Sequence, residues 1–323
     1  MESATLRRAP PLPALLQAGL ICLLLIGAVI AWTVTDDRMS GMDAGPATDL
    51  GELGWFLGIW VVMMAAMMFP SIWPMVLMYA RVQEGRHARG REVPAGAMPL
   101  FVAGYLITWG TAGVVAYGLI EIGESLNLDF LAWGEAGQYV AGGVLIAAAI
   151  YQLTPLKDVC LTKCRNPLSF ILHSWKPGRL GALRMGIEHG AWCVGCCWAL
   201  MAALFALGVM SIGWMALIAA FIALEKLLPW KAVANRGIAV MLVVLGLAVA
   251  IVPEDIPGLV LPNSPEAAAA MENMGMEGGA MEDDAMEDDP MPAGGMEDDA
   301  MPAGGGMKDE GTSGSGMNDE AMP

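Results

Sequence analysis

The sequence predicts an all-α protein: a polytopic bundle of about seven transmembrane helices followed by a disordered, acidic, methionine-rich tail. The chain has 323 residues, of which 56% are hydrophobic and 15% are charged, and its mean hydropathy is +0.55. This composition is typical of a membrane protein and excludes an ordinary soluble domain. Most of the net charge of −16 lies after residue 270, so it indicates nothing about the partners of the apolar part.

Apolar segments of the length that a bilayer requires define residues 1–252 as a transmembrane domain and leave 253–323 as the tail. The expected helices cover about residues 15–34, 53–80, 98–120, 136–153, 186–207, 212–228 and 233–252. Arg7 and Arg8 precede the first segment, as in a signal peptide. However, the run is long and lacks a clear small-residue cleavage site, so we expect a retained helix.

Basic residues alternate between the connections, and this alternation predicts the orientation. They lie before the first segment and after the second, fourth and sixth, whereas connections 36–52 and 121–135 are acidic. Because Lys and Arg in short loops stay cytoplasmic, we expect the N-terminus inside and the tail outside. The protein is then a multi-pass protein of the inner (plasma) membrane, with the lipid bilayer as its first partner.

The fifth segment carries the densest group of reactive side chains, in the stretch GIEHGAWCVGCCWALM at 186–201. At about 100° per residue, four of them fall close to one helix face: His189, Cys193, Cys196 and Cys197. Glu188 lies beside that face. Because an ionisable residue near a membrane interior is costly unless it has a partner or a function, the stretch predicts a functional site.

Three interpretations compete for these cysteines. Cysteine is a small buried hydrophobe and packs well between helices. Cys193-Val-Gly-Cys196 is a C-x-x-C pair, which could form a disulfide and exchange with other thiols. Thiolate, imidazole and thioether ligands together favour Cu(I) or zinc over magnesium or calcium, and this softness favours the metal interpretation.

The second segment supplies thioethers. Four methionines form two i,i+4 pairs: Met63, Met64, Met67 and Met68. Pro70 and Pro74 follow, and we expect them to kink the helix and free backbone carbonyls. Methionine is also a flexible core filler, so packing remains an alternative for this segment.

Two further features leave alternatives open. Cys160 and Cys164 lie in a connection on the reducing side, where a C-x-x-x-C pair is a thiol pair or a metal ligand rather than a disulfide. Glu225 is either an inward carboxylate near Glu188 or part of a helix end at the headgroups, where Lys226 partly cancels its charge.

The tail repeats methionine every five residues from Met271 to Met301, among acidic residues. A period of five fits neither a helix nor a strand, so the repeat serves no packed face. Thioethers suit Cu(I), so an extracytoplasmic copper-collecting tail is one interpretation. The other is a solvated acidic tail expanded by repeat slippage.

The stretches MMAAMMFPS and GIEHGAWCVGCCWALM together resemble a family of uncharacterised bacterial polytopic integral membrane proteins described as predicted metal-binding. The likeness covers about residues 54–252 and leaves out the tail. It implies a multi-helix membrane fold. It also implies a metal role for Met63, Met64, Met67, Met68, Glu188, His189, Cys193, Cys196 and Cys197.

We therefore predict that the protein binds a soft metal, Cu(I) first and zinc second, between the second and fifth helices. Its function would be copper transport, delivery or homeostasis, with a periplasmic metallochaperone or copper enzyme as partner. His189 would be a borderline ligand, and Glu188 a proton acceptor that lets the thiols ionise. We find no nucleotide-binding loop, expect no nucleic acid partner and assign no catalytic residue.

Two alternatives from other classes stay open. One is a membrane thiol–disulfide oxidoreductase that uses the Cys193/Cys196 pair. The other is a non-catalytic subunit of a larger membrane complex.

Overall fold

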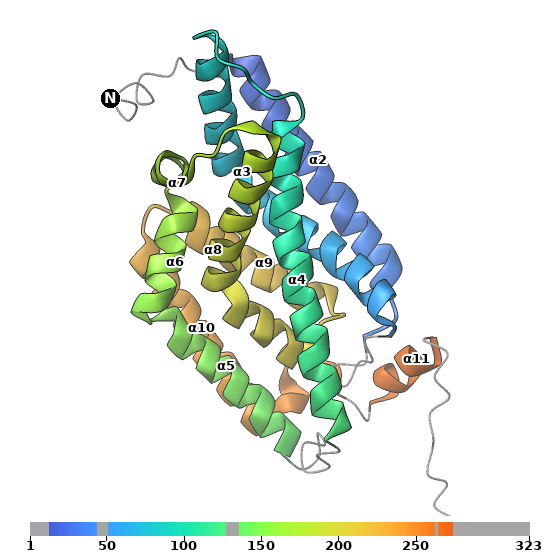
Figure 1. The fold of residues 1–323 in the computed structure, drawn as a ribbon. Coiled ribbons are helices and arrows are strands. Elements are labelled where there is room, and N and C mark those ends of the chain that lie inside the picture. The colour runs from blue at the N-terminus through green and yellow to red at the C-terminus, as the bar shows by residue number, and fades with distance from the viewer. Residues whose placement is uncertain (1–12, 44–50, 127–135, 262–263, 274–323) are drawn as a thin grey trace, which may run out of the picture. The chain divides into compact units, whose positions relative to one another are not determined.

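The computed structural model describes residues 13–43, 51–126, 136–261 and 264–273, and the regular secondary structure in them is helical (Figure 1). The long helices are α2 (Ala14–Met39), α3 (Leu53–His87), α4 (Ala97–Ser125), α5 (Gln138–Gln152), α8 (Gly178–Leu207), α9 (Ile212–Leu227) and α10 (Lys231–Ile251). The shorter ones are α6 (Pro155–Arg165), α7 (Pro167–Ser174), the 3₁₀ turn η4 (Pro253–Asp255) and α11 (Pro265–Asn273). The all-α prediction is confirmed.

The number of candidate membrane spans is smaller than the sequence predicted. By length and composition, five helices could cross a membrane, namely α2, α3, α4, α8 and α10. Helices α5 and α6 together form a sixth candidate that is bent by 66°. Helix α9 has only 16 residues, which is short for a bilayer that needs about 20. The seven apolar segments are all helical, but five or six of them are candidate spans.

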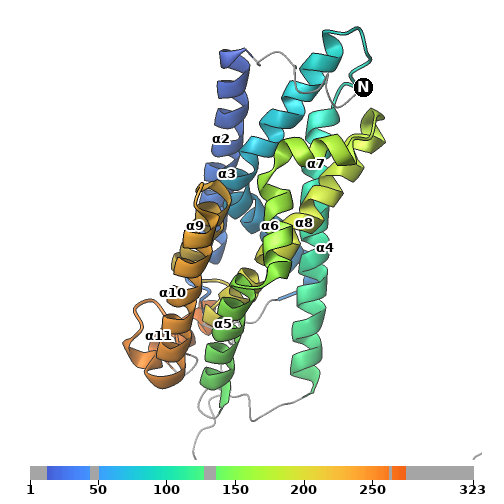
Figure 2. The same ribbon diagram turned by 90° about the vertical axis from the view of Figure 1, so that its left-hand side faces the viewer.

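Helix α8 is the central helix of the bundle, since it contacts α4, α5, α6 and α9. Beside it, α5 pairs with α10 and α2 pairs with α3, as Figures 1 and 2 show. The crossing of α4 and α8 is very close. A Cβ added to Gly186 would lie 2.0 Å from the Phe101 carbonyl oxygen, and one added to Gly104 would lie 2.2 Å from the Leu183 carbonyl oxygen.

Small residues make this approach possible, because they let two helix backbones touch. The Thr108 hydroxyl then donates a hydrogen bond across the crossing to the Ile187 carbonyl, at 3.1 Å. Backbone contact of this kind fixes the rotation of α8 about its axis. It thereby fixes the direction in which the α8 cysteines point.

Two helices lie where the sequence predicted only a cytoplasmic loop. Pro155 and Pro167 occupy the first turns of α6 and α7, where proline is tolerated because its missing N–H would be unpaired there. The Thr154 hydroxyl accepts a hydrogen bond from the Lys157 backbone N–H at 3.3 Å and caps α6. A Thr-Pro start signal therefore ends α5 and begins a new helix in a new direction.

The beginning of the predicted tail has local structure. η4 follows α10, and the Trp214 indole donates a hydrogen bond to the Gly258 carbonyl at 2.8 Å. Helix α11 comes next, with Ala267 and Ala270 buried. The remainder of the predicted tail, with the methionine repeat beyond Asn273, lies outside the described residues.

We predict that Gly186→Ala destabilises the protein by about 1–3 kcal/mol, since the methyl group would collide with the Phe101 carbonyl and overpack the crossing. Gly118→Ala on α4 is the matched control, because nothing lies within 4 Å of the added carbon. The control should be neutral or stabilise by up to about 1 kcal/mol through helix propensity. Thermal unfolding in detergent measures both. Equal midpoints would contradict the backbone contact.

Candidate metal centre

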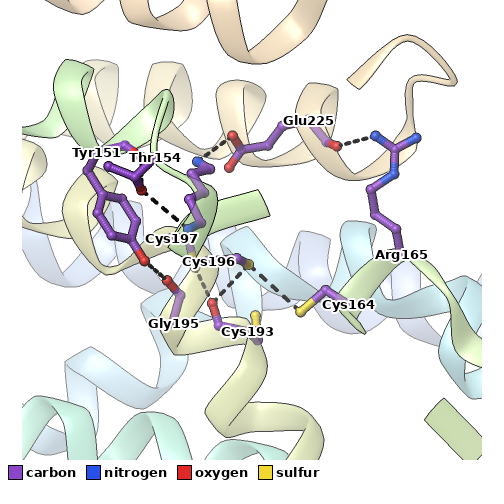
Figure 3. A network of polar contacts seen from close by, with 10 residues as sticks. Tyr151, Thr154, Cys164, Arg165, Cys193, Gly195, Cys196, Cys197 and Glu225 are labelled. Carbon is purple, nitrogen blue, oxygen red and sulfur yellow. Dashed lines mark hydrogen bonds and ion pairs between the residues drawn. The ribbon is translucent and has the colours of Figure 1, made fainter. Parts of the chain in front are cut away.

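Three cysteine sulfurs from two helices meet in the interior. The Sγ atoms of Cys164 on α6 and of Cys193 and Cys196 on α8 all lie within 4.8 Å of one another. Figure 3 shows the Cys164 and Cys196 side chains pointing toward each other, with their sulfurs 3.8 Å apart. Cys193 and Cys196 are fully buried, and Cys164 is half-buried.

The arrangement fits a soft metal ion. A thiolate–metal bond of about 2.3 Å places the sulfurs of a three- or four-coordinate site about 4 Å apart. The 3.8 Å separation of Cys164 and Cys196 meets that requirement without a change of backbone. No carboxylate belongs to the described group, so its donors are those of Cu(I) or zinc rather than of magnesium or calcium.

Polar clamps on either side of Cys164 hold α6 in this position. The Lys157 ammonium lies 2.6 Å from the Glu225 carboxylate of α9, and both side chains are buried. The Arg165 guanidinium donates to the backbone carbonyl of Glu225 (Figure 3). It also donates to the Leu228 carbonyl at the end of α9. A helix C-terminus offers unpaired carbonyls and negative partial charge, which suit an arginine.

Helix α8 places its own cysteines by backbone geometry. Cys193 and Cys196 are three residues apart and therefore share a face. The thiols of Cys196 and Cys197 both donate to the Cys193 carbonyl, at 3.1 and 2.9 Å (Figure 3). Cys197 is buried but does not belong to the three-sulfur group.

The methionines of α3 lie in the same interior, and a lysine connects one of them to the cysteines. All four predicted methionines are 0–2% exposed and belong to the same buried cluster as the α8 cysteines. The Lys226 ammonium on α9 lies 3.8 Å from the Met68 sulfur, 3.4 Å from the Ser71 hydroxyl and 3.0 Å from the Cys193 sulfur. The two sulfur-bearing motifs thus share one side chain, which points inward.

Direct contact between α3 and α8 is made by aromatic rings. The Trp60 and Phe205 rings stack with centroids 5.7 Å apart. Helix α3 continues through Pro70 and Pro74 without interruption. The sequence placed the site between the second and fifth helices. The three sulfurs that the structure brings together come from α6 and α8.

Glu188 and His189, which the sequence also predicted as site residues, do not belong to the three-sulfur group either. The His189 ring packs against Phe101, Tyr105 and Phe170, and its Nδ1 has no hydrogen-bond partner among the described residues. Glu188 accepts a hydrogen bond from the Ser174 hydroxyl at 2.6 Å. Its carboxylate also lies 3.9 Å from the Lys176 ammonium. That carboxylate is 38% exposed.

Sequence reasoning left two residues out of the site. Cys164 had a signal, since its C-x-x-x-C spacing with Cys160 indicated a thiol pair or a metal ligand, but nothing in the sequence joined it to α8. Lys226 had no such signal. A lysine at a helix end is ordinarily expected in the headgroups, and only the packing of α9 against α3 and α8 turns it inward.

The model of a family described as PpoB2 copper chaperone matches residues 57–249. The chain belongs to the PpoB2 copper chaperone family. The matched region contains the α3 methionines, the α6 and α8 cysteines and Lys226, and it ends before the tail. PpoB2 membership agrees with the metal role that the resemblance implied and indicates a copper-related function. Neither the curated proteins nor the solved structures contain a match to the chain.

The buried ion pair of this PpoB2 chain yields a test of the α6 clamp. We predict that Lys157→Met alone destabilises the protein by about 3–5 kcal/mol, because it leaves a buried carboxylate unpaired. The double variant Lys157→Met/Glu225→Met should recover most of this loss, since a pair of apolar side chains often replaces a buried ion pair without cost. Thermal unfolding of the parent protein, Lys157→Met, Glu225→Met and the double variant measures the pair. A loss of stability in the double variant equal to the sum of the two single losses would contradict a direct pair.

Ligand placement yields a second test. Changes to groups outside the metal's ligands typically weaken binding about 10–100-fold. Cys164→Ser should weaken Cu(I) binding by more than this, because it removes a ligand. Glu188→Gln should change it by about fivefold at most, because an exposed ion pair is worth under about 1 kcal/mol. Competition with a chromophoric Cu(I) chelator under reducing conditions measures both. An equal loss in the two variants would return Glu188 to the site.

Proposed function

We propose that this protein is a membrane-embedded carrier that binds Cu(I) at Cys164, Cys193 and Cys196 and passes it to a copper-requiring protein. The observation that carries the proposal is the convergence of three sulfurs from α6 and α8 within 4.8 Å of one another. Membership of the copper chaperone family supports copper as the cargo. Sulfur donors favour Cu(I) over harder cations.

The outward faces of several helices support a bilayer environment. Helices α2, α4 and α10 expose many large apolar side chains, among them Ile26, Val29, Val115, Leu119 and Val244. Such surfaces are unfavourable in water and favourable in lipid. The charges of the connections support an N-terminus inside and a tail outside, in the inner membrane.

The α3 methionines form the access path in this proposal. Met63, Met64, Met67 and Met68 are neutral thioether donors that lie in the same buried cluster as the cysteines. Met68 is linked to the cysteine group, because its sulfur and the Cys193 sulfur both contact the Lys226 ammonium. Neutral thioethers suit a soft ion in transit, and the charged thiolates suit the place where the ion rests.

The acidic tail and His189 complete the proposal. Tail methionines would exchange Cu(I) with the outer end of the methionine path. The buried, unpartnered His189 Nδ1 is available as a borderline ligand one turn before Cys193. The receiving partner would be a periplasmic metallochaperone or a copper enzyme.

Metal content tests the proposal. We expect the full-length protein, and a truncation that ends at residue 262, to retain copper after purification under reducing conditions. Cys164→Ser/Cys193→Ser/Cys196→Ser should lose it. Cys22→Ser is the matched control, because this thiol is exposed on α2 and should leave the copper content unchanged. Mass spectrometry of the purified proteins gives the stoichiometry.

The other outcomes of this experiment identify the other functions. Copper lost with the tail and kept in the triple variant would place binding outside the membrane domain. A metal-free protein with a Cys193–Cys196 disulfide would identify a thiol–disulfide oxidoreductase. A metal-free protein with unreactive thiols would leave a structural subunit.

A further inference from the structure

Lys226 is placed where a metal site would not ordinarily hold a cation. Its ammonium donates to the Cys193 sulfur at 3.0 Å and to the Ser71 hydroxyl at 3.4 Å, and it lies 3.8 Å from the Met68 sulfur. These three groups come from α8 and α3, so the lysine spans from α9 to both sulfur-bearing helices. None of its hydrogen-bond partners is a carboxylate.

The neighbouring charges are engaged elsewhere. The Glu225 carboxylate, next in the chain, is turned toward Lys157 at 2.6 Å. Arg165 is held by the carbonyls at the end of α9. Lys163 lies over the Trp192 ring at 5.9 Å from its centroid and is exposed. Among the described residues, the positive charge in contact with the sulfur centre is that of Lys226.

A fixed positive charge beside a metal site discriminates between metals by their charge. Coulomb repulsion scales with the product of the two charges, so a divalent ion is repelled twice as strongly as a monovalent one at the same place. In a buried site this repulsion is screened far less than in water. Sulfur ligands by themselves accept both Cu(I) and zinc, so softness alone leaves that choice undecided.

We propose that Lys226 is a specificity-determining residue, whose ammonium makes the sulfur centre select monovalent Cu(I) over divalent zinc. This inference rests on the proposed function, namely that the three cysteines bind the metal. The contribution is a difference between two affinities. Any effect of a substitution that is equal for the two metals cancels in the ratio of their affinities.

The test is the ratio of the Zn(II) and Cu(I) dissociation constants, each measured by competition with a chromophoric chelator on full-length protein under reducing conditions. Lys226→Gln removes the charge without adding a sulfur ligand, and the ratio should fall at least about tenfold toward zinc. Lys226→Arg keeps the charge and should keep the ratio within about threefold of the parent protein. Lys163→Gln removes an equal charge from an exposed site, where salt and water screen it. It should also keep the ratio within about threefold of the parent protein.

An unchanged ratio in a folded Lys226→Gln variant would overturn the proposal, as would an equal fall in Lys163→Gln. Lys226→Leu is a second neutral variant, so poor folding of one replacement does not decide the result. Failure of the proposed function looks different. In that case the parent protein and its Cys164→Ser/Cys193→Ser/Cys196→Ser variant bind the same amount of copper, whatever occupies position 226.

Discussion

The three-cysteine group depends on one buried ion pair, between Lys157 and Glu225. Both side chains are almost completely buried, and in an apolar interior neither charge could be left unpaired without a large desolvation cost. The ion pair therefore holds helix α6 in one position against α9. Cys164 follows Lys157 by two helical turns and lies close to the same face of α6. The contact that satisfies the charge thus brings the third sulfur to the two sulfurs of α8.

The other half of the centre is set by packing rather than by charge. Helix α8 crosses α4 with its backbone in contact at Gly186, and the Thr108 hydroxyl bonds across the crossing. Three residues before Thr108 on α4, the Tyr105 hydroxyl lies 3.1 Å from the Cys193 sulfur. A rigid crossing on one side and a polar clamp on the other hold the sulfurs close to the spacing that a thiolate-bound metal needs, so little rearrangement would accompany binding.

Ligand softness and fixed charge affect metal selectivity in this interior in different ways. Thioethers of α3 and thiols of α6 and α8 supply donors that suit Cu(I), and they exclude harder ions. The lysine between them adds what sulfur alone lacks, a distinction between ions of different charge. In the proposed function, a neutral thioether path that ends at a thiolate centre beside an ammonium would let the protein hold Cu(I) against zinc and still release it.

The sequence by itself determined the seven apolar helices, the placement of the α3 methionines and α8 cysteines within them, and the sulfur donors that favour a soft metal. These properties follow from hydropathy, periodicity and ligand type, which are local. The tertiary structure decided which side chains meet. Glu188 and His189 are neighbours in the chain, but one residue turns about 100° around the helix axis, so Glu188 pairs with Lys176 while His189 packs among aromatic rings. Likewise Glu225 and Lys226 face different partners. Which of two adjacent residues points into the site depends on which helices pack together, and that choice is made by contacts between segments far apart in the sequence.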